Sequence, residues 1–339
     1  MKVLLVGGAG YIGIPLAERL LERGDEVAIY DRFYFGEERL EAFKSNEGLT
    51  LFRGDSRTIE PAIFEGVDAV VQLAALSNDP ACEIEEGLSQ DINLTGTLRC
   101  ARLAKQAGVK RYVFSSSCSV YGAGVSGALD EQSPKNPVSL YAKLKIEAES
   151  ALAEMADGDF VVTALRHATA YGLAPRMRFD LVVNLMTLHA FKNGKIFVLG
   201  GGMQWRPLVH VRDIGKAFTL ALDAPAEKVQ RQAFNVGSDE QNYQIRTIAS
   251  IVASIVPGAT VEVVPDDPDK RSYNTSFKKV HEVLGFTAEY DVDFAVSEIY
   301  DALRRGLQDD IRTRTLAYYR HLLDAERLVK SLSIDGKLL

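Results

Sequence analysis

The stretch MKVLLVGGAGYIG, Met1 to Gly13, decides the fold of this chain. An apolar run of the length of one buried strand, Val3 to Val6, leads into glycines at the spacing GxxGxxG, and an amphipathic helical pattern follows at once. Strand, glycine turn and helix in this order are the context that a dinucleotide-binding motif needs. One glycine permits the tight turn, one lets the backbone approach a pyrophosphate, and one lets the helix pack on the strand. The phosphates then bind free N–H groups at the positive end of the helix dipole.

An acidic residue stands where such a motif needs one. The run Glu26 to Tyr30 reads as a second strand, and Asp31 closes it, about 20 residues after the glycines. A carboxylate there accepts hydrogen bonds from the adenosine ribose and repels a 2′-phosphate, which favours NAD over NADP. The neighbouring Arg32 weakens that preference, and the alternative is that Asp31 only caps a turn.

The rest of the first half alternates strands with helices. Such a rhythm predicts an α/β fold with a doubly wound, Rossmann-type parallel sheet. The further strands are expected at Leu49–Arg53, Asp68–Leu73, Arg111–Phe114 and Val161–Arg166, with helices at Ile14–Arg23 and Asn93–Ala107. We therefore expect a dinucleotide-binding domain over residues 1–172, with a returning segment near 205–240.

From about Leu173 the alternation becomes less regular, which indicates a smaller mixed α/β domain over 173–339 that binds the substrate. Its expected elements are helices at Leu181–Ala190, Val211–Leu222 and Ile245–Val256 and strands at Lys195–Leu199 and Val261–Val264. The final helix carries an apolar stripe, which can pack on its own domain or on another subunit.

Composition excludes several classes of protein. The 339 residues carry a net charge of −7, which argues against a nucleic-acid binder. Cys82, Cys100 and Cys118 form no CxxC pair and no Cys/His cluster with zinc spacing, so we expect a reduced, cytoplasmic protein without a structural metal. The first apolar run is too short for a signal peptide, and no run approaches the ~20 apolar residues that span a bilayer.

A serine-rich turn and a YxxxK pair provide candidate chemistry. The expected strand at 111–114 runs into SSSCSVYG, Ser115 to Gly122, and a helix starting near Ser139 carries Tyr141 and Lys145 on one face. A lysine ammonium beside the phenol favours the phenolate, so we expect the pKa of Tyr141 to fall below its usual ~10. Ser117 can hold the reacting oxygen while Tyr141 moves its proton. Alone, a YxxxK match is common by chance; the order of glycines, acid, serine and YxxxK makes it specific.

Together these motifs resemble the extended short-chain dehydrogenase/reductase family, in its nucleotide-sugar epimerase/dehydratase branch. The resemblance covers roughly residues 1–220. It rests on GGAGYIG (7–13), Asp31, Gly54-Asp55-Ser56, Leu73-Ala74-Ala75, Asn93, SSSCSVYG (115–122), YAKLK (141–145) and WRPLVHVRD (205–213).

The family resemblance implies a role for each matching position. Ser117, Tyr141 and Lys145 would be catalytic. The cofactor NAD would be held by Gly7, Gly10, Tyr11, Ile12, Gly13, Asp31, Arg32, Asp55, Ser56, Leu73, Ala74, Ala75, Asn93, Ser115, Tyr141, Lys145 and His167. A nucleotide-diphosphate sugar would meet Ser77, Ser117, Cys118, Thr169, Asn184, Arg206 and Arg271, with Arg206 on the diphosphate.

Departures from the family pattern narrow the activity. Cys118 and Ser119 stand where dehydratases of the family carry an Asp-Glu pair and where decarboxylases usually carry a glutamate. Thr169 replaces the asparagine typical of galactose-type 4-epimerases. We therefore predict an NAD-dependent epimerase acting at C4 of a nucleotide-linked hexose, as a homodimer. The alternatives are a net sugar dehydrogenase or ketoreductase and a non-catalytic NAD-binding protein. Arg176 and Arg178 can serve as phosphate ligands or as surface charges.

Overall fold

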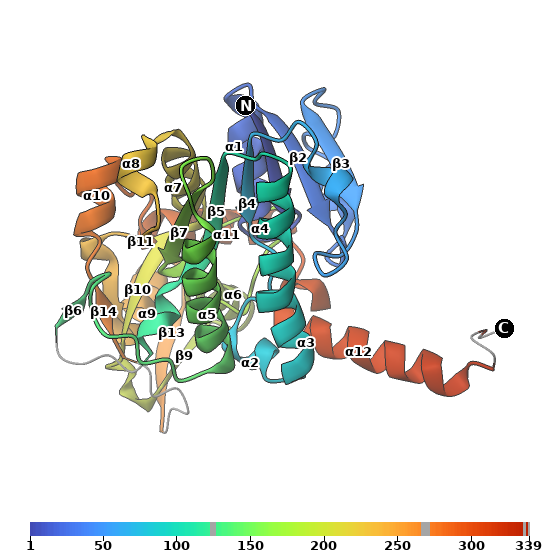
Figure 1. The fold of residues 1–339 in the computed structure, drawn as a ribbon. Coiled ribbons are helices and arrows are strands. Elements are labelled where there is room, and N and C mark those ends of the chain that lie inside the picture. The colour runs from blue at the N-terminus through green and yellow to red at the C-terminus, as the bar shows by residue number, and fades with distance from the viewer. Residues whose placement is uncertain (123–126, 266–271, 335–336, 338–339) are drawn as a thin grey trace.

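A seven-stranded parallel sheet forms the centre of the protein, with the strand order β11-β7-β5-β4-β1-β2-β3 (Figure 1). The computed structural model describes residues 1–122, 127–265, 272–334 and 337. The strands are β1 (Lys2–Val6), β2 (Glu26–Asp31), β3 (Leu49–Arg53), β4 (Ala69–Gln72), β5 (Arg111–Ser117), β7 (Val161–His167) and β11 (Gln232–Val236). The Rossmann-type doubly wound fold expected from the sequence is confirmed.

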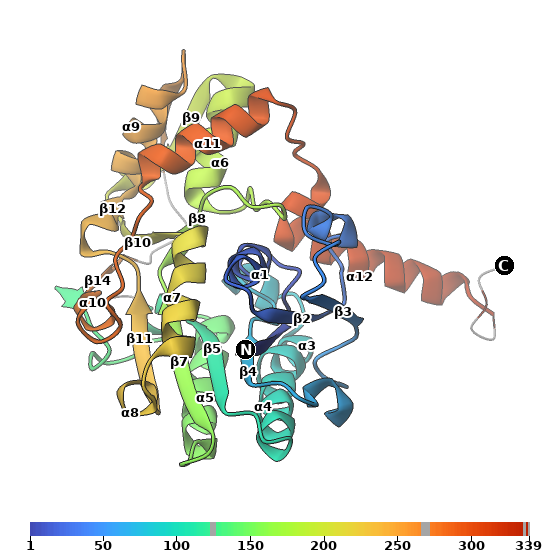
Figure 2. The same ribbon diagram turned by 90° about the horizontal axis from the view of Figure 1, so that it is seen from above.

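Helices cover both faces of this sheet (Figure 2). On one face lie α1 (Gly13–Glu22) and α7 (Val211–Asp223); on the other lie α4 (Thr97–Gln106) and α5 (Leu140–Met155). Side chains alternate along β1, so Val3 and Leu5 join the first core while Leu4 and Val6 join the second. Burial on both faces explains why β1 reads as a continuous apolar run.

The order of strands reverses between β1 and β4, which pair with each other in parallel. At such a switch point the connections leave the strand ends in opposite directions, so a crevice opens at the carboxyl edge. The turn after β1 and the serine turn after β5 both lie at this edge.

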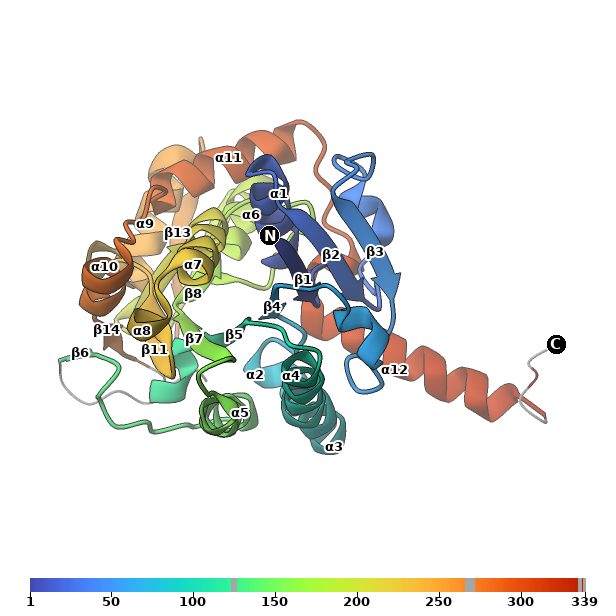
Figure 3. The same cartoon turned by 45° about the horizontal axis from the view of Figure 1, so that its top comes forward.

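A smaller, mixed part stands beside the carboxyl edge (Figure 3). It contains the sheets β12-β10-β8, β13-β9 and β14-β6. The strands are β6 (Ala128–Leu129), β8 (Thr169–Tyr171), β9 (Lys195–Leu199), β10 (Trp205–His210), β12 (Asn242–Gln244), β13 (Thr260–Val264) and β14 (Asn274–Thr275). Helices α6 (Val182–Asn193), α9 (Ile245–Ile255) and α11 (Val292–Arg304) pack around a separate apolar core.

Several elements differ from the sequence expectation. The helix expected over 93–107 begins as a π-helical turn, Asp91–Gly96, and continues as α4. The last helix, α12 (Thr315–Leu332), packs on the body only through its first turns and then projects away from it (Figure 1). The remaining helices are α2 (Asp79–Cys82), α3 (Glu86–Gln90), α8 (Ala226–Val229) and α10 (Lys278–Leu284).

Within the described ranges, none of the helices has the length and apolarity that a membrane-crossing segment requires.

Candidate active site

The glycine turn is shaped by two close approaches of the backbone. Gly7 has φ +83°, and a Cβ on it would lie 2.5 Å from the backbone nitrogen of Ala74. A Cβ on Gly13, at the start of α1, would lie 2.4 Å from the carbonyl oxygen of Gly8. At Gly10 the nearest atom would be 3.5 Å away, in ordinary contact. The turn therefore needs glycine at its two ends and leaves its middle open toward the cavity.

A cavity of about 920 Å³ runs from this turn along the carboxyl edge to the smaller part. Most positions predicted for cofactor or substrate line it. They are Gly7, Gly10, Tyr11, Ile12, Gly13, Asp31, Arg32, Asp55, Ser56, Leu73, Ala74, Ala75, Ser77, Ser115, Ser117, Tyr141, Lys145, His167, Thr169 and Arg206. One cavity thus contains both the residues that the resemblance assigns to NAD and those that it assigns to the sugar nucleotide.

Asp31 sits at one end of the cavity, at the end of β2. Its carboxylate accepts hydrogen bonds from the backbone nitrogens of Ala9 (3.0 Å) and Phe33 (2.8 Å), so it is fixed against the glycine turn. Burial raises the pKa of Asp31. The neighbouring Asp55 is paired with Arg57 and Arg32; although burial opposes it, this pairing lowers the pKa of Asp55 to about 2.

Tyr141 and Lys145 project from α5 into the middle of the cavity. Ser139 caps this helix by accepting a hydrogen bond from the backbone nitrogen of Ala142 at 3.2 Å. The Nζ of Lys145 donates to the carbonyl oxygen of Ser115 at 2.6 Å and lies 5.5 Å from the centroid of the Tyr141 ring. The α5 face therefore brings the lysine and the phenol to the end of β5.

Burial dominates the protonation of this pair. It lowers the pKa of Lys145 to about 8. It also raises the pKa of Tyr141, with the charge of Asp79 acting in the same direction and a hydrogen bond from Ser117 opposing it. The expectation that the lysine lowers the pKa of Tyr141 is therefore wrong for this structure, because the phenol is buried and Lys145 is turned toward the Ser115 carbonyl.

Three of the predicted positions that the structure describes, Asn93, Cys118 and Asn184, do not line the cavity. The predicted Arg271 lies outside the described residues. Asn93 instead holds the turn after β4, accepting from the Leu76 nitrogen at 2.8 Å and donating to the Leu76 carbonyl oxygen at 3.1 Å. The buried Cys118 donates its Sγ–H to the carbonyl oxygen of Arg166 at 3.2 Å, on the far side of the serine turn. Direct ligand contact by Asn93 and Cys118 is therefore corrected to a supporting role.

Asn184 likewise does not line the cavity and instead holds neighbouring residues in place. It is fully buried, accepts from the backbone nitrogen of Gly172 at 3.0 Å, and donates to the Tyr11 hydroxyl at 3.1 Å. The Tyr11 hydroxyl in turn donates to the Gly172 carbonyl oxygen at 2.6 Å. Asn184 and Tyr11 thus tie the glycine turn to the segment after β8.

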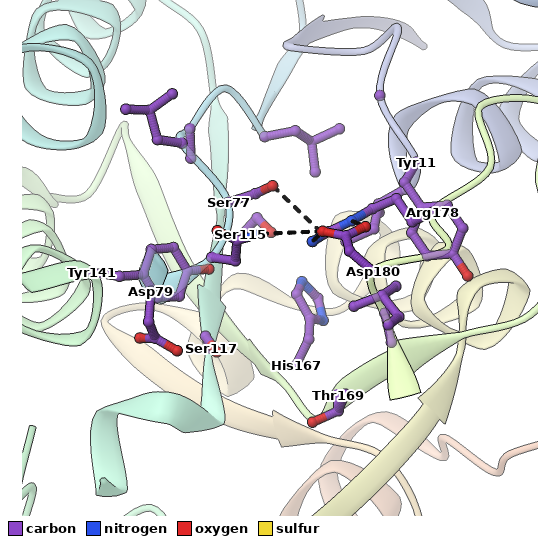
Figure 4. A pocket seen from close by; sticks show the side chains of 18 of the residues that line it. Tyr11, Ser77, Asp79, Ser115, Ser117, Tyr141, His167, Thr169, Arg178 and Asp180 are labelled. Atoms are coloured by element: carbon purple, nitrogen blue, oxygen red, sulfur yellow. Dashed lines mark hydrogen bonds and ion pairs between the residues drawn. The ribbon is translucent and has the colours of Figure 1, made fainter. Parts of the chain in front are cut away.

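Several cavity residues were not predicted from the sequence. Figure 4 shows Tyr141 and Asp79 at one side of the cavity, Arg178 and Asp180 at the other, and His167 between them. Arg178 is buried and pairs with Asp180 at 2.8 Å, so its interpretation as a surface charge is wrong. Its alternative interpretation, as a ligand of phosphate, stays a prediction. Arg176, the other arginine left open between phosphate ligand and surface charge, is also buried and lines the cavity. Further lining side chains that were not predicted are Tyr34, Phe35, Leu316 and Tyr319.

Comparison with known proteins agrees with this geometry. The family model described as "NAD dependent epimerase/dehydratase family" matches residues 3–237. The chain belongs to this family. It is 29% identical over 319 residues to UDP-glucose 4-epimerase of Lactobacillus helveticus, covering 86% of this chain and 93% of that protein. It is 30% identical to UDP-glucuronic acid decarboxylase 1 of Arabidopsis thaliana, over 82% of this chain and 65% of that protein.

Solved structures of similar fold include complexes with NAD. MoeE5 in complex with UDP-glucuronic acid and NAD superposes with a TM-score of 0.79 at 26% identity, over 91% of this chain and all (100%) of that one. UDP-glucuronic acid 4-epimerase from Bacillus cereus, with a TM-score of 0.81 at 21% identity over 90% of this chain and 99% of that one, shares the fold. The protein is a NAD-dependent enzyme of this epimerase/dehydratase family.

The residues of this epimerase-family cavity fit NAD. Besides the glycine turn and Asp31, two buried side chains that line it carry polar atoms without a hydrogen-bond partner among the described residues: both ring nitrogens of His167 and the Nε of Arg176. Burial lowers the pKa of His167 to about 3, so its ring is neutral and can donate one hydrogen bond and accept another. Among the described residues, no group of His, Cys, Asp and Glu side chains could hold a metal ion.

Proposed function

We propose that the protein is a NAD-dependent epimerase acting at C4 of a nucleotide-diphosphate hexose. The observation that carries this proposal is the position of Ser117, Tyr141 and Lys145 in the cavity that also contains the glycine turn and Arg206. A sugar placed between the NAD site and the smaller part would meet this triad. The UDP-glucose 4-epimerase relative and the UDP-sugar complex of MoeE5 support the substrate class.

Each member of the triad has a separate task at the reacting hydroxyl. Tyr141 takes the hydroxyl proton in one direction and returns it in the other, within reach of the Ser117 hydroxyl that orients the oxygen. Lys145, whose Nζ is held 2.6 Å from the Ser115 carbonyl oxygen, would bind the nicotinamide ribose of the cofactor and so hold it beside the phenol. Bound NAD supplies a hydride acceptor that can return the hydride to either face of the sugar.

The rest of the cavity favours a nucleotide-linked substrate. Arg206 on β10, in the smaller part, is largely buried, donates to the Trp205 carbonyl oxygen at 2.9 Å and lines the cavity. We assign the substrate diphosphate to it because a guanidinium matches two phosphate oxygens at once. Thr169 would line the sugar site, and the serine turn has no carboxylate at 118–119, unlike the pattern expected of a dehydratase or decarboxylase.

Product analysis tests the reaction. The purified protein is incubated with UDP-, GDP-, CDP- and dTDP-hexoses, with and without added NAD, and the sugars are followed by NMR. Interconversion without net NADH is expected; stoichiometric NADH would identify a dehydrogenase instead. Tyr141→Phe should reduce turnover by about 10²–10⁴-fold, whereas the matched Tyr300→Phe, on α11 outside the cavity, should leave it unchanged.

We also propose that the protein is a cytoplasmic homodimer. The projecting end of α12 exposes Leu328, Val329 and Leu332, an apolar stripe suited to a second copy of the chain. Cys82, Cys100 and Cys118 are free thiols, in keeping with a reducing compartment. Light scattering on the full chain should give twice the mass of 37.2 kDa.

A further inference from the structure

The first turns of α12 and the loop after β2 meet over the end of the cavity that contains Asp31. The Tyr318 hydroxyl donates to the carbonyl oxygen of Tyr34 at 2.8 Å. The ring of Phe35 lies 5.6 Å from that of Tyr318 and 5.8 Å from that of Tyr319. Residues 34–35 and 318–319 are nearly 300 positions apart in sequence, yet Tyr34, Phe35 and Tyr319 line the same cavity.

Two ion pairs tie the same segments together nearby. The Nη1 of Arg312 lies 2.6 Å from a carboxylate oxygen of Glu38, and the Nη2 of Arg39 lies 3.5 Å from one of Asp310. Both pairs link the one-turn helix Glu37–Leu40 to the segment leading into α12. We call residues 34–40 together with residues 310–319 the clasp.

Arg176 lies beneath the clasp. Its guanidinium stacks on Phe35, with Cζ 3.7 Å from the ring centroid, and its Nη2 donates to Thr315 Oγ1 at 2.8 Å. Its side chain is 3% exposed, and its Nε has no hydrogen-bond partner in the described part of the chain. The nearby carboxylate of Asp180 already accepts hydrogen bonds from the Nε and Nη2 of Arg178. A buried guanidinium that lines a cavity and keeps one N–H unsatisfied is a ready ligand for an anion.

The location of Arg176 indicates which anion it would bind. Its guanidinium stacks on Phe35, in the loop that follows Asp31. Tyr319 and Tyr11, the latter from the glycine turn, are close enough to act on its charge. A dinucleotide whose ribose meets Asp31 has its diphosphate at the glycine turn. Arg206, the cation assigned to the substrate, lines the cavity from β10 in the smaller part.

Burial and the neighbouring Arg178 lower the pKa of Arg176 to about 10, which leaves it positively charged at neutral pH. A positive charge at this place would attract the diphosphate of the cofactor.

We propose that Arg176 is a ligand of the NAD diphosphate and that the clasp closes over the bound cofactor, so that release of NAD requires α12 and the loop after β2 to separate. The clasp contacts lie between two chain segments and not within one element, so they can open without unfolding the sheet. The protein would thus retain its cofactor through many turnovers, as suits a reaction in which NAD is regenerated. The proposal concerns the cofactor alone and does not depend on which sugar is bound.

Binding measurements on cofactor-stripped protein test the Arg176 assignment. Arg176→Ala should weaken the Kd for NAD by about 30-fold, the size expected for charge-assisted hydrogen bonds to a phosphate. The Kd for UDP, used as a probe of the substrate diphosphate site, should stay unchanged. Arg176→Lys, which keeps the charge, should recover part of the NAD affinity. Weakened UDP binding with normal NAD binding would overturn the assignment.

A second pair of variants tests the clasp without touching a buried residue. The double change Arg312→Ala with Tyr318→Phe removes the ion pairs of Arg312 with Glu38 and Asp310 and the hydrogen bond of Tyr318, and should speed NAD dissociation by about tenfold in a stopped-flow chase. Arg327→Ala, which removes the exposed pair with Asp324 on the projecting end of α12, is the control and should dissociate NAD at the wild-type rate. Equal rates in all three proteins would overturn the clasp, whatever the fate of the Arg176 variants.

Discussion

The buried ion pair between Glu149 and Arg166 should govern the stability of the catalytic helix. Glu149 lies one turn after Lys145 on α5, and its carboxylate accepts from Arg166 Nη2 at 2.7 Å, from Arg166 Nε at 2.9 Å and from Ser116 Oγ at 2.5 Å. The pair joins α5 to β7 and to the end of β5, directly beside Ser117. Arg166 is 2% exposed, so Glu149→Ala leaves a buried cation without its counterion.

The structure sets the size of the effect. Breaking a buried pair by removing one partner costs about 3–5 kcal/mol. Lys135, 3.5 Å from the same carboxylate, is itself a cation and gives Arg166 no compensation. Urea unfolding followed by circular dichroism should show this loss as a lower midpoint at unchanged slope. Glu147→Ala, an exposed change on the same helix, is the control and should stay within about 0.5 kcal/mol of wild type.

The same variants give a pH test. Burial alone would raise the pKa of Glu149, but the hydrogen bonds and charge of Arg166 outweigh it and hold the pKa below its ordinary value. A carboxyl whose folded pKa is lowered stabilises the protein above its unfolded pKa of ~4.3 and loses that contribution as pH falls through the folded pKa. The difference between wild type and Glu149→Ala should therefore shrink in acid.

A double variant separates the pair from packing. Replacing both partners, Glu149→Met with Arg166→Met, removes both buried charges and should cost less than the sum of the two single changes. The reasoning is refuted if Glu149→Ala loses less than about 1 kcal/mol, or if the two single costs simply add.

Three further changes probe the cofactor turn and the triad. Asp31→Asn should weaken NAD binding by about tenfold, as a lost charged hydrogen bond predicts, without weakening NADP; equal losses for both would contradict the ribose assignment. Gly7→Ala should destabilise by about 1–3 kcal/mol from its positive φ and also abolish NAD binding, because its Cβ meets the Ala74 backbone. The control Gly24→Ala, at φ +84° with no atom within 4 Å, should show only the backbone strain. Lys145→Met should inactivate the enzyme yet raise its thermal stability at pH 7. Burial lowers the folded pKa of Lys145 to about 8, so at pH 7 the buried ammonium destabilises the folded protein, and this cost disappears only as pH rises from 8 toward 10. A variant less stable than wild type at pH 7 would contradict that sign.

Local sequence patterns were sufficient to predict the central sheet and the glycine turn. The strand before Gly7 is apolar on both faces because helices cover both faces, and the glycines stand where backbone crowds backbone. Tyr141 and Lys145 could be placed on one helical face from their spacing, and Ser139 could be recognised as the start of that helix. These features depend on neighbours within a few residues, which a sequence displays directly.

The parts that sequence reasoning missed depend on contacts across the chain. Arg176 meets Thr315, which lies 139 positions away, and only such contacts show that the start of α12 lies beside the cavity wall that contains Arg176. Asp79 enters the active site because the turn after β4 is held by Asn93, so the carboxylate reaches the Tyr141 side of α5. Cys118 was misplaced because a helical turn after β5 aims it away from the cavity, a direction that its neighbour Ser117 does not reveal.

The pKa of Tyr141 shows why spacing alone predicts chemistry incompletely. Spacing places a cation near the phenol, but burial acts on both side chains and disfavours the charged form of each. The first turns of α5 therefore carry two titratable groups whose charged forms are disfavoured by burial. One turn later, the buried charge of Glu149 is stabilised by hydrogen bonds from Ser116 and Arg166. Because Ser116 bonds to Glu149 while Ser117 bonds to Tyr141, one short stretch of β5 couples the anchor to the proton-transfer group. Loosening that anchor should thus disturb the Ser117–Tyr141 geometry and lower kcat before it lowers affinity for the sugar nucleotide.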